Sequence, residues 1–325
     1  MNEIKSVLKN NMNRALSKKG YIFLTITFMS ISIALAIFFT VKFEVKENVA
    51  YVGRMDSPVS IKGINLVQVN EMPAMSEFVT KKYDAVIVPA EDGKLEVKTI
   101  RGSEFKKELE KTIQKNDNIP LQSKRKIGTA ILGYTCMFIL ISTVMFMSFY
   151  TEEREKGIFT RIVSSKIYIA NYLLGHIIFT FFMLYVPTIL VLIIEKNIFK
   201  VDIGFSYLQY SLLIGLLILF GISFSLFVST VVNKIDNVVS ISSSIIVLTT
   251  ILSGVFFTVK ERGTIFDWIV KAFPQKQYLL FAESIENGNR FVNSVGHLLY
   301  IFVITVVFFS LSIWLNRKKV ILGKI

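Results

Sequence analysis

Six long stretches of the chain contain no Asp, Glu, Lys or Arg, and each of them is long enough to cross a lipid bilayer. These stretches are residues 20–41, 127–151, 167–194, 203–233, 237–259 and 291–316. About 20 residues of helix span the roughly 30 Å of hydrocarbon in a bilayer. Inside the bilayer each backbone amide needs a hydrogen-bond partner within its own segment, so runs this apolar form helices. The sequence therefore predicts an α-helical polytopic membrane protein with six transmembrane helices.

The basic residues are concentrated at the two ends of the chain. The net charge is +13; residues 1–19 hold five basic residues and one acidic residue, and residues 317–325 hold four basic residues and no acidic one. Basic residues beside membrane helices favour the cytoplasmic side, where they also meet anionic lipids. We expect both termini in the cytoplasm and the bilayer, not nucleic acid, as the partner of these charges. Without outer-membrane features or a cleaved leader, the sequence indicates a multi-pass plasma-membrane protein of a bacterium.

A long polar insert, residues 42–127, separates the first predicted membrane helix from the other five. Short β-rich segments at 49–52, 64–69, 84–88 and 95–100 alternate with helical patterns at 75–82 and 103–115. This order predicts a small α/β domain, which the topology places outside the cell. The insert has no His cluster, Ser-His-Asp set or Cys pair, which favours a binding or gating cap over an enzyme. The single Cys of the chain excludes an internal disulfide and a Cys-rich metal site.

Two further segments, residues 1–19 and 260–290, have apolar residues in patterns that predict short helices. Apolar residues at helical spacing in residues 1–19 predict an amphipathic elbow helix on the cytoplasmic leaflet. Two short apolar stretches, broken by Pro274, predict short or re-entrant extracellular helices. The predicted organisation is an elbow (1–19), a first membrane helix (20–41), an extracellular α/β domain (42–127), a second membrane helix (128–150), a charged cytoplasmic helix (151–166), three membrane helices (167–194, 203–232 and 237–259), an extracellular segment (260–290), a sixth membrane helix (291–316) and a basic cytoplasmic tail (317–325).

The charged helix predicted at 151–166 carries the clearest functional signal. Its acids, at positions 152, 153 and 155, suit a helix N-terminus, and its later bases suit the C-terminal end. An apolar stripe with an exposed aromatic side chain follows, made of Ile158, Phe159, Ile162 and Val163. Such a helix at the membrane surface could be the docking point for a soluble motor subunit, although a simple charged turn between two helices has the same composition.

One family has this pattern. The resemblance lies in the residues Glu153-Arg154-Glu155-Lys156-Gly157-Ile158-Phe159-Thr160-Arg161-Ile162. Directly after a second membrane helix, they resemble the E-R-E-x-G-T-x-x-x-L segment of ABC-2 type transporter permeases. The chain departs from that segment at Ile158, where Thr is usual, and at Ile162, where Leu or Met is common.

The resemblance implies a membrane subunit of an ABC exporter, in which this segment is the coupling helix that contacts a cytoplasmic ABC ATPase subunit. It also implies a second permease copy or a paralogue. The implied ATPase-docking residues are Glu153, Arg154, Glu155, Gly157, Ile158, Phe159, Arg161 and Ile162. No G-x-x-x-x-G-K-[ST] phosphate loop occurs, so we expect no cofactor in this chain and no enzyme activity of its own, with ATP and Mg on the partner.

The uncharged, Phe-rich interior favours outward movement of an amphipathic or hydrophobic cargo: a peptide, an antibiotic or a lipid-like molecule. His176 and His297 are interpreted as helix-packing hydrogen bonders. An alternative is a non-transporting receptor or scaffold that uses the 42–127 domain. A channel or secondary carrier is a third class, but the sequence shows no selectivity filter or paired intramembrane carboxylates. Co-purification of an ATPase distinguishes the exporter hypothesis from the receptor hypothesis and from the channel or carrier hypothesis.

Overall fold

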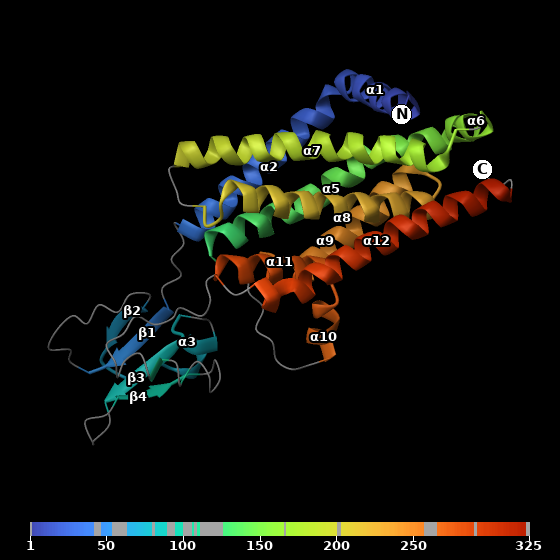
Figure 1. Ribbon diagram of the computed structural model, residues 1–325. Helices are drawn as coiled ribbons and strands as arrows, with labels where there is room; N and C mark the ends of the chain where they lie inside the picture. The colour runs from blue at the N-terminus through green and yellow to red at the C-terminus, as the bar shows by residue number, and fades with distance from the viewer. Residues whose placement is uncertain are drawn as a thin grey trace. The chain divides into compact units, whose positions relative to one another are not determined.

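Six helices in the part of the chain that the structure describes are long and apolar enough to cross a membrane. They are α2 (Lys19–Val41), α5 (Ile127–Glu155), α7 (Ile169–Phe199), α8 (Tyr207–Val231), α9 (Ile235–Leu252) and α12 (Phe291–Ile321) (Figure 1). The computed structural model describes residues 2–41, 47–53, 64–79, 82–89, 95–99, 106, 109–110, 126–165, 167–199, 203–256, 265–288 and 291–322. The predicted fold class, a polytopic helical membrane protein with a small α/β domain, is confirmed.

Helix α5 is the most buried of the six and forms the centre of the bundle, with α8 next to it. The two helices approach closely because α8 has glycine at the contact: a Cβ on Gly221 would lie 2.8 Å from the Thr143 side chain. One turn away, the hydroxyl groups of Thr143 and Ser225 are 3.1 Å apart and hydrogen bonded. Small residues and one buried hydrogen bond therefore hold this central pair together.

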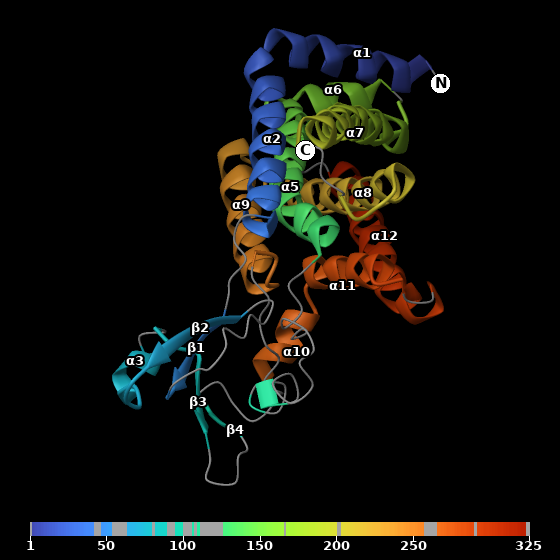
Figure 2. The same ribbon diagram turned by 90° about the vertical axis from the view of Figure 1, so that its left-hand side faces the viewer.

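Helix α1 (Asn2–Ser17) precedes the first membrane helix and crosses it at a large angle (Figure 2). It packs on α7, where a Cβ on Gly175 would lie 2.7 Å from the Val7 side chain. Asn171 of α7 donates a hydrogen bond of 2.8 Å to Glu3. The elbow helix is thus held by protein contacts along one side.

Three membrane helices, α5, α7 and α12, continue beyond the C-terminal ends of their charge-free runs. Helix α7 ends at Phe199, so Glu195, which was expected in a loop, lies within the helix and is 7% exposed. Helix α12 continues through Arg317, Lys318 and Lys319 to Ile321. The absence of charge marks the apolar part of a helix, whereas backbone hydrogen bonding continues through charged residues until a cap ends it.

Two short helices, α10 (Ile265–Lys271) and α11 (Pro274–Glu286), precede α12. Pro274 occupies the first turn of α11, where its missing amide costs nothing. At the other end, the Glu286 carboxylate accepts hydrogen bonds from the backbone amides of Gly128 and Thr129, both 2.8 Å, and from the Thr129 hydroxyl at 2.6 Å. Glu286 therefore caps the N-terminus of the central helix α5, where a negative charge is favourable.

Residues Lys42–Lys124 form a separate compact unit. Its strands are β1 (Glu47–Val52), β2 (Ile64–Val69), β3 (Ala85–Pro89) and β4 (Leu95–Lys98), in the order β2-β1-β3-β4, and helix α3 spans Met75–Val79. Strand β1 is parallel to both β2 and β3, and β4 is antiparallel to β3. Alternate residues of the strands are buried on opposite faces, Val49 and Ile87 on one and Ala50 and Val86 on the other. The helix predicted at 103–115 lies mostly outside the described residues, although Leu109 is buried with the Val49 face.

Replacing Glu286 with Ala should destabilise the bundle by about 2 kcal/mol, because three charge-assisted hydrogen bonds to the start of α5 are lost. Thermal unfolding of the purified protein in detergent measures the change. Glu283→Ala is the matched control, since Glu283 lies one turn earlier on α11 and does not contact α5 through a hydrogen bond. Equal melting temperatures for the two variants would contradict the capping role.

Candidate functional site

The charged segment predicted as one helix over 151–166 is divided by Gly157. Helix α5 runs to Glu155, and Gly157 then adopts a left-handed conformation with φ of 69°. Its amide donates a hydrogen bond of 3.0 Å to the Arg154 carbonyl, which closes the end of α5. The short helix α6 (Ile158–Ser164) follows, and Lys166 lies outside the described residues. The acids were expected at a helix N-terminus, and this was wrong: they occupy the last turn of α5.

Carboxylates at a helix C-terminus meet the negative end of the helix dipole, so they require nearby positive charge. Glu152 is paired with Arg14 Nη2 at 2.6 Å, Lys18 Nζ at 3.3 Å and Lys156 Nζ at 2.6 Å. Two of these three bases come from the N-terminal segment. The basic residues that were interpreted only as membrane-facing charges therefore also neutralise the end of α5.

Glu153 is the most enclosed charge of the segment, with 3% of its surface exposed. Its carboxylate accepts hydrogen bonds from Arg14 Nη1 at 2.6 Å, from Asn10 Nδ2 at 3.2 Å and from the Tyr172 hydroxyl. The Nε2 atom of His176 lies 3.3 Å from the same carboxylate. Because these partners belong to α1 and α7, Glu153 joins both helices to the end of α5.

His176 is fully buried and links the same helices a second time. Its Nδ1 atom lies 3.0 Å from the side-chain nitrogen of Asn11 on α1. With Asn11 as the donor, Nδ1 accepts, and the ring proton lies on Nε2, which faces Glu153. His176 is thus a helix-packing hydrogen bonder, as the sequence analysis interpreted it.

Arg154 and Glu155 connect α5 to two other helix ends. Arg154 donates to the Ser229 carbonyl in the last turn of α8 and to Asn233 Oδ1 at 3.0 Å. The Glu155 carboxylate accepts from the Ile235 amide at 3.0 Å, in the first turn of α9. Both placements match the helix dipole, with the cation at a C-terminus and the anion at an N-terminus. We call Glu153, Arg154 and Glu155 the charged hub.

Helix α12 reaches the same region through Tyr150, one turn before the charged hub. The Tyr150 hydroxyl donates to Asn316 Oδ1 at 2.7 Å, and Asn316 Nδ2 donates to the Thr230 hydroxyl at 3.0 Å. Lys319 Nζ also donates to the Thr230 carbonyl at 2.6 Å. The end of α5 is therefore connected by hydrogen bonds to α1, α7, α8, α9 and α12.

Phe159 was expected to be exposed, and the structure shows it with no exposed surface. Its ring packs edge-on against Tyr150, with centroids 5.9 Å apart, and against Tyr172 at 5.4 Å. Burial of this aromatic ring fixes the short helix α6 onto α5 and α7. The exposed side chains of α6 are instead Ile158, which is 37% exposed, Arg161 and Ser164, while Ile162 is half-buried.

The sequence analysis missed four residues that complete this region: Arg14, Tyr172, Asn233 and Asn316. Arg14 is the only arginine in residues 1–19, and arginine is the basic residue best suited to a paired carboxylate. That signal was available, but nothing in the sequence pairs it with Glu153, 139 positions away. The other three lie in or beside membrane helices without any distinguishing pattern.

The geometry describes a membrane bundle in which charged and polar side chains join six helix ends around the C-terminus of α5. Among the described residues, no three His, Cys, Asp or Glu side chains lie close enough to hold a metal ion. The class is a polytopic membrane protein whose charged segment organises the helix ends.

A model of the ABC-2 family transporter proteins matches residues 74–314, and the chain belongs to this family. None of the curated proteins compared with the chain matches it. Members of the family are the membrane component of a transporter and work with an ABC ATPase subunit. The chain is therefore a multi-pass permease subunit.

Replacing Arg14 with Met should destabilise the protein by about 3 kcal/mol, because the buried Glu153 carboxylate loses its paired charge. Adding Glu153→Gln should recover part of the loss, since the remaining amide needs no counter-charge. Unfolding of the two single variants and the double variant measures the coupling energy. Lys5→Met, an exposed position on α1, is the control. Additive losses would show that the pair does not interact.

Proposed function

We propose that this chain is the membrane-spanning subunit of an ATP-driven exporter, and that a separate ATPase subunit moves it by pushing on helix α6. ATP and Mg are bound and hydrolysed on that partner. The observation that carries this proposal is the connection of α6 to the end of α5, which is hydrogen bonded to α1, α7, α8, α9 and α12. A displacement of α6 changes the positions of all these helix ends together.

The connection between α6 and the bundle is short and enclosed. Two residues, Lys156 and Gly157, separate α6 from α5, and the Phe159 ring is packed between Tyr150 of α5 and Tyr172 of α7. A packed aromatic contact transmits displacement because the interior has little free space to absorb it. ATP-driven movement of the partner would then favour one of two bundle packings, and transport requires that ATP changes their relative stability.

Fewer of the docking residues proposed from the sequence are available to an ATPase than the sequence suggested. Glu153, Arg154 and Glu155 are engaged within the chain, and Phe159 is buried. The exposed apolar and charged side chains of α6 that a partner could contact are Ile158 and Arg161, with Ile162 at the edge. We propose that Ile158 is the apolar anchor and that Arg161 fixes the orientation of the ATPase, because hot spots combine a buried anchor with arginine.

The orientation proposed for the chain places α6 in the cytoplasm, where ATP is available. Helix α1, helix α6 and the end of α12 lie at one end of the bundle (Figure 1). The basic residues of α1 and of the end of α12 are gathered there as well, as the positive-inside rule requires of a cytoplasmic face. This arrangement supports both termini inside a bacterial plasma membrane and the 42–124 unit outside. A second copy or a paralogue would complete the transporter.

The proposed cargo is an amphipathic or hydrophobic molecule that moves outward. The charge-free runs of the membrane helices support an apolar cargo, because an ion path is usually marked by Asp, Glu, Lys or Arg within such runs. A receptor or scaffold that uses the 42–124 unit is the other candidate, and it requires no contact between α6 and an ATPase.

Ile158→Asp and Arg161→Glu should each weaken co-purification of the ATPase, by about tenfold or more for the anchor position. Affinity purification of the tagged chain from its own membrane, with quantification of the bound ATPase, measures this. Arg317→Glu is the matched control, because it reverses an exposed charge near the end of α12. Phe159→Asp is not informative here, because it places a charge in a closed aromatic cluster and disrupts folding.

The outcome separates the two candidates. If the ATPase is retained by both α6 variants at the level of the control, the docking role of α6 is wrong. If no ATPase accompanies the unmodified chain, the receptor candidate replaces the exporter.

A further inference from the structure

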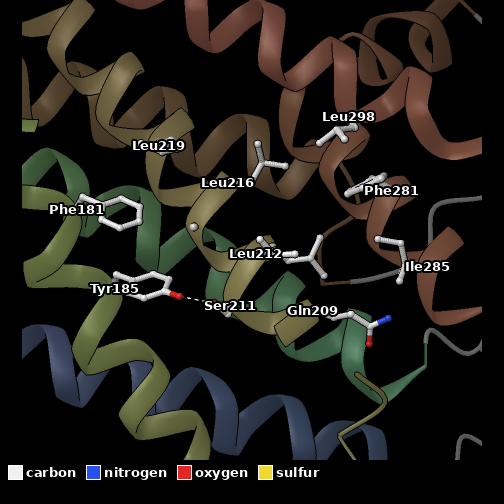
Figure 3. A pocket seen from close by; sticks show the side chains of 12 residues that line it. Phe181, Tyr185, Gln209, Ser211, Leu212, Leu216, Leu219, Phe281, Ile285 and Leu298 are labelled. Atoms are coloured by element: carbon white, nitrogen blue, oxygen red, sulfur yellow. Dashed lines mark hydrogen bonds between the residues drawn. The ribbon is translucent and has the colours of Figure 1, made fainter. Parts of the chain in front are cut away.

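A cavity of about 740 Å³ lies on the membrane bundle between α7, α8, α11 and α12 (Figure 3). Its size falls within the roughly 300–1,000 Å³ typical of ligand pockets. Helix α8 supplies Leu212, Leu216 and Leu219, and the other walls include Phe181 of α7 and Phe281 of α11. Three of the four helices that line it, α7, α8 and α12, are long and apolar enough to cross a membrane, and we infer that their side of the cavity faces hydrocarbon.

The polar groups of the cavity are gathered on one side of it. Tyr185, Ser211 and Gln209 lie together in Figure 3, and the leucines and Phe281 occupy the remainder. Gln209 and Leu219 are separated by roughly 15 Å along the axis of α8. The polar side is near the start of α8, at the opposite end from Ser229, where the charged hub is attached. The cavity therefore suits an elongated molecule that is apolar along most of its length and polar at one end.

The side chains at the polar end of the cavity have hydrogen-bond donors available for a ligand. The Gln209 side-chain oxygen accepts from the Ser206 amide at 2.8 Å, and its side-chain nitrogen has no partner among the described residues. The Tyr185 and Ser211 hydroxyls are bonded to each other, which uses one of their two protons and leaves the other. No charged side chain is among the described residues that line the cavity. These groups offer donors to a neutral acceptor such as the carbonyl of an ester.

We propose that this cavity binds one ester-linked acyl chain of a membrane phospholipid, with the ester carbonyl at Gln209, Tyr185 and Ser211 and the chain along Leu212, Leu216 and Leu219. An apolar cavity at the level of the hydrocarbon is filled from the bilayer, and only the donors at its polar end distinguish it from the rest of the lipid-facing surface. The inference is independent of the proposed exporter function, because it concerns the bundle alone.

Gly215 offers a way to fill the cavity without disturbing the helix. A Cβ at this position would lie 3.8 Å from the Tyr185 ring and 3.9 Å from the Phe181 ring, which is ordinary contact. Gly215→Ala should therefore fold normally, and Gly215→Leu should occupy the space of the chain. Gly296→Leu is the matched control, because Gly296 lies on α12 with nothing within 4 Å of its would-be Cβ.

The test uses the full chain in liposomes that contain a phospholipid with a diazirine in one acyl chain. After illumination, peptide mapping should find residues 209–219 labelled about tenfold more than the exposed face of α9, a preference equivalent to about 1.4 kcal/mol. Labelling should fall about tenfold in Gly215→Leu, by an intermediate amount in Gly215→Ala, and not at all in Gly296→Leu. An ether-linked analogue, which lacks the carbonyl, should label the cavity less, and Tyr185→Phe should reduce that difference.

Two results would overturn the proposal. Equal labelling of α8 and of the exposed face of α9, unaffected by Gly215→Leu, would mean that the cavity is ordinary lipid-facing surface. Equal labelling by ester-linked and ether-linked lipids would exclude recognition by the polar end.

Discussion

The buried carboxylate of Glu153 is the constraint on which the arrangement of the helix ends depends. A carboxylate removed from water is stable only when it is paired and hydrogen bonded. Arg14 and Asn10 of α1 and Tyr172 of α7 supply those partners, so the charge is stable only with three helices in place. This requirement converts an amphipathic N-terminal segment, which could have remained on the lipid surface, into a fixed part of the bundle.

Arg154 and Glu155 stabilise the neighbouring helix ends, where it is backbone groups, and not a buried side chain, that need hydrogen-bond partners. The last carbonyls of α8 and the first amides of α9 have no partners within their own helices. Arg154 and Glu155 satisfy one group at each of these ends from the end of α5. The connections made by the charged hub thus lie at the C-terminal end of α5, whereas the cavity beside α8 is lined mainly by apolar residues.

Some of this organisation could be predicted from the sequence, and some could not. The six membrane helices follow from long charge-free runs, and β1, β2 and β3 follow from local apolar patterns. The exposure of Phe159 was predicted wrongly because an aromatic residue beside charges has the same local pattern whether it faces a partner protein or its own bundle. The acids at 152, 153 and 155 were predicted at the start of a helix, but they lie in the last turn of α5. The local sequence around Gly157 is compatible with a helix that begins there and with one that ends there.

The sequence by itself determined that the chain crosses a membrane, because the energetic cost of unpaired backbone groups and charges in hydrocarbon depends on each segment alone. The segment that begins at Glu153 indicated the family as a local pattern, and the family-model match over residues 74–314 shows it. Only the tertiary structure decided what that segment does within the chain. Arg14 and Glu153 are separated by 139 positions, and their interaction exists only after α1 has packed against α5 and α7. Contacts over such distances depend on the packing of the whole bundle, which no local pattern specifies.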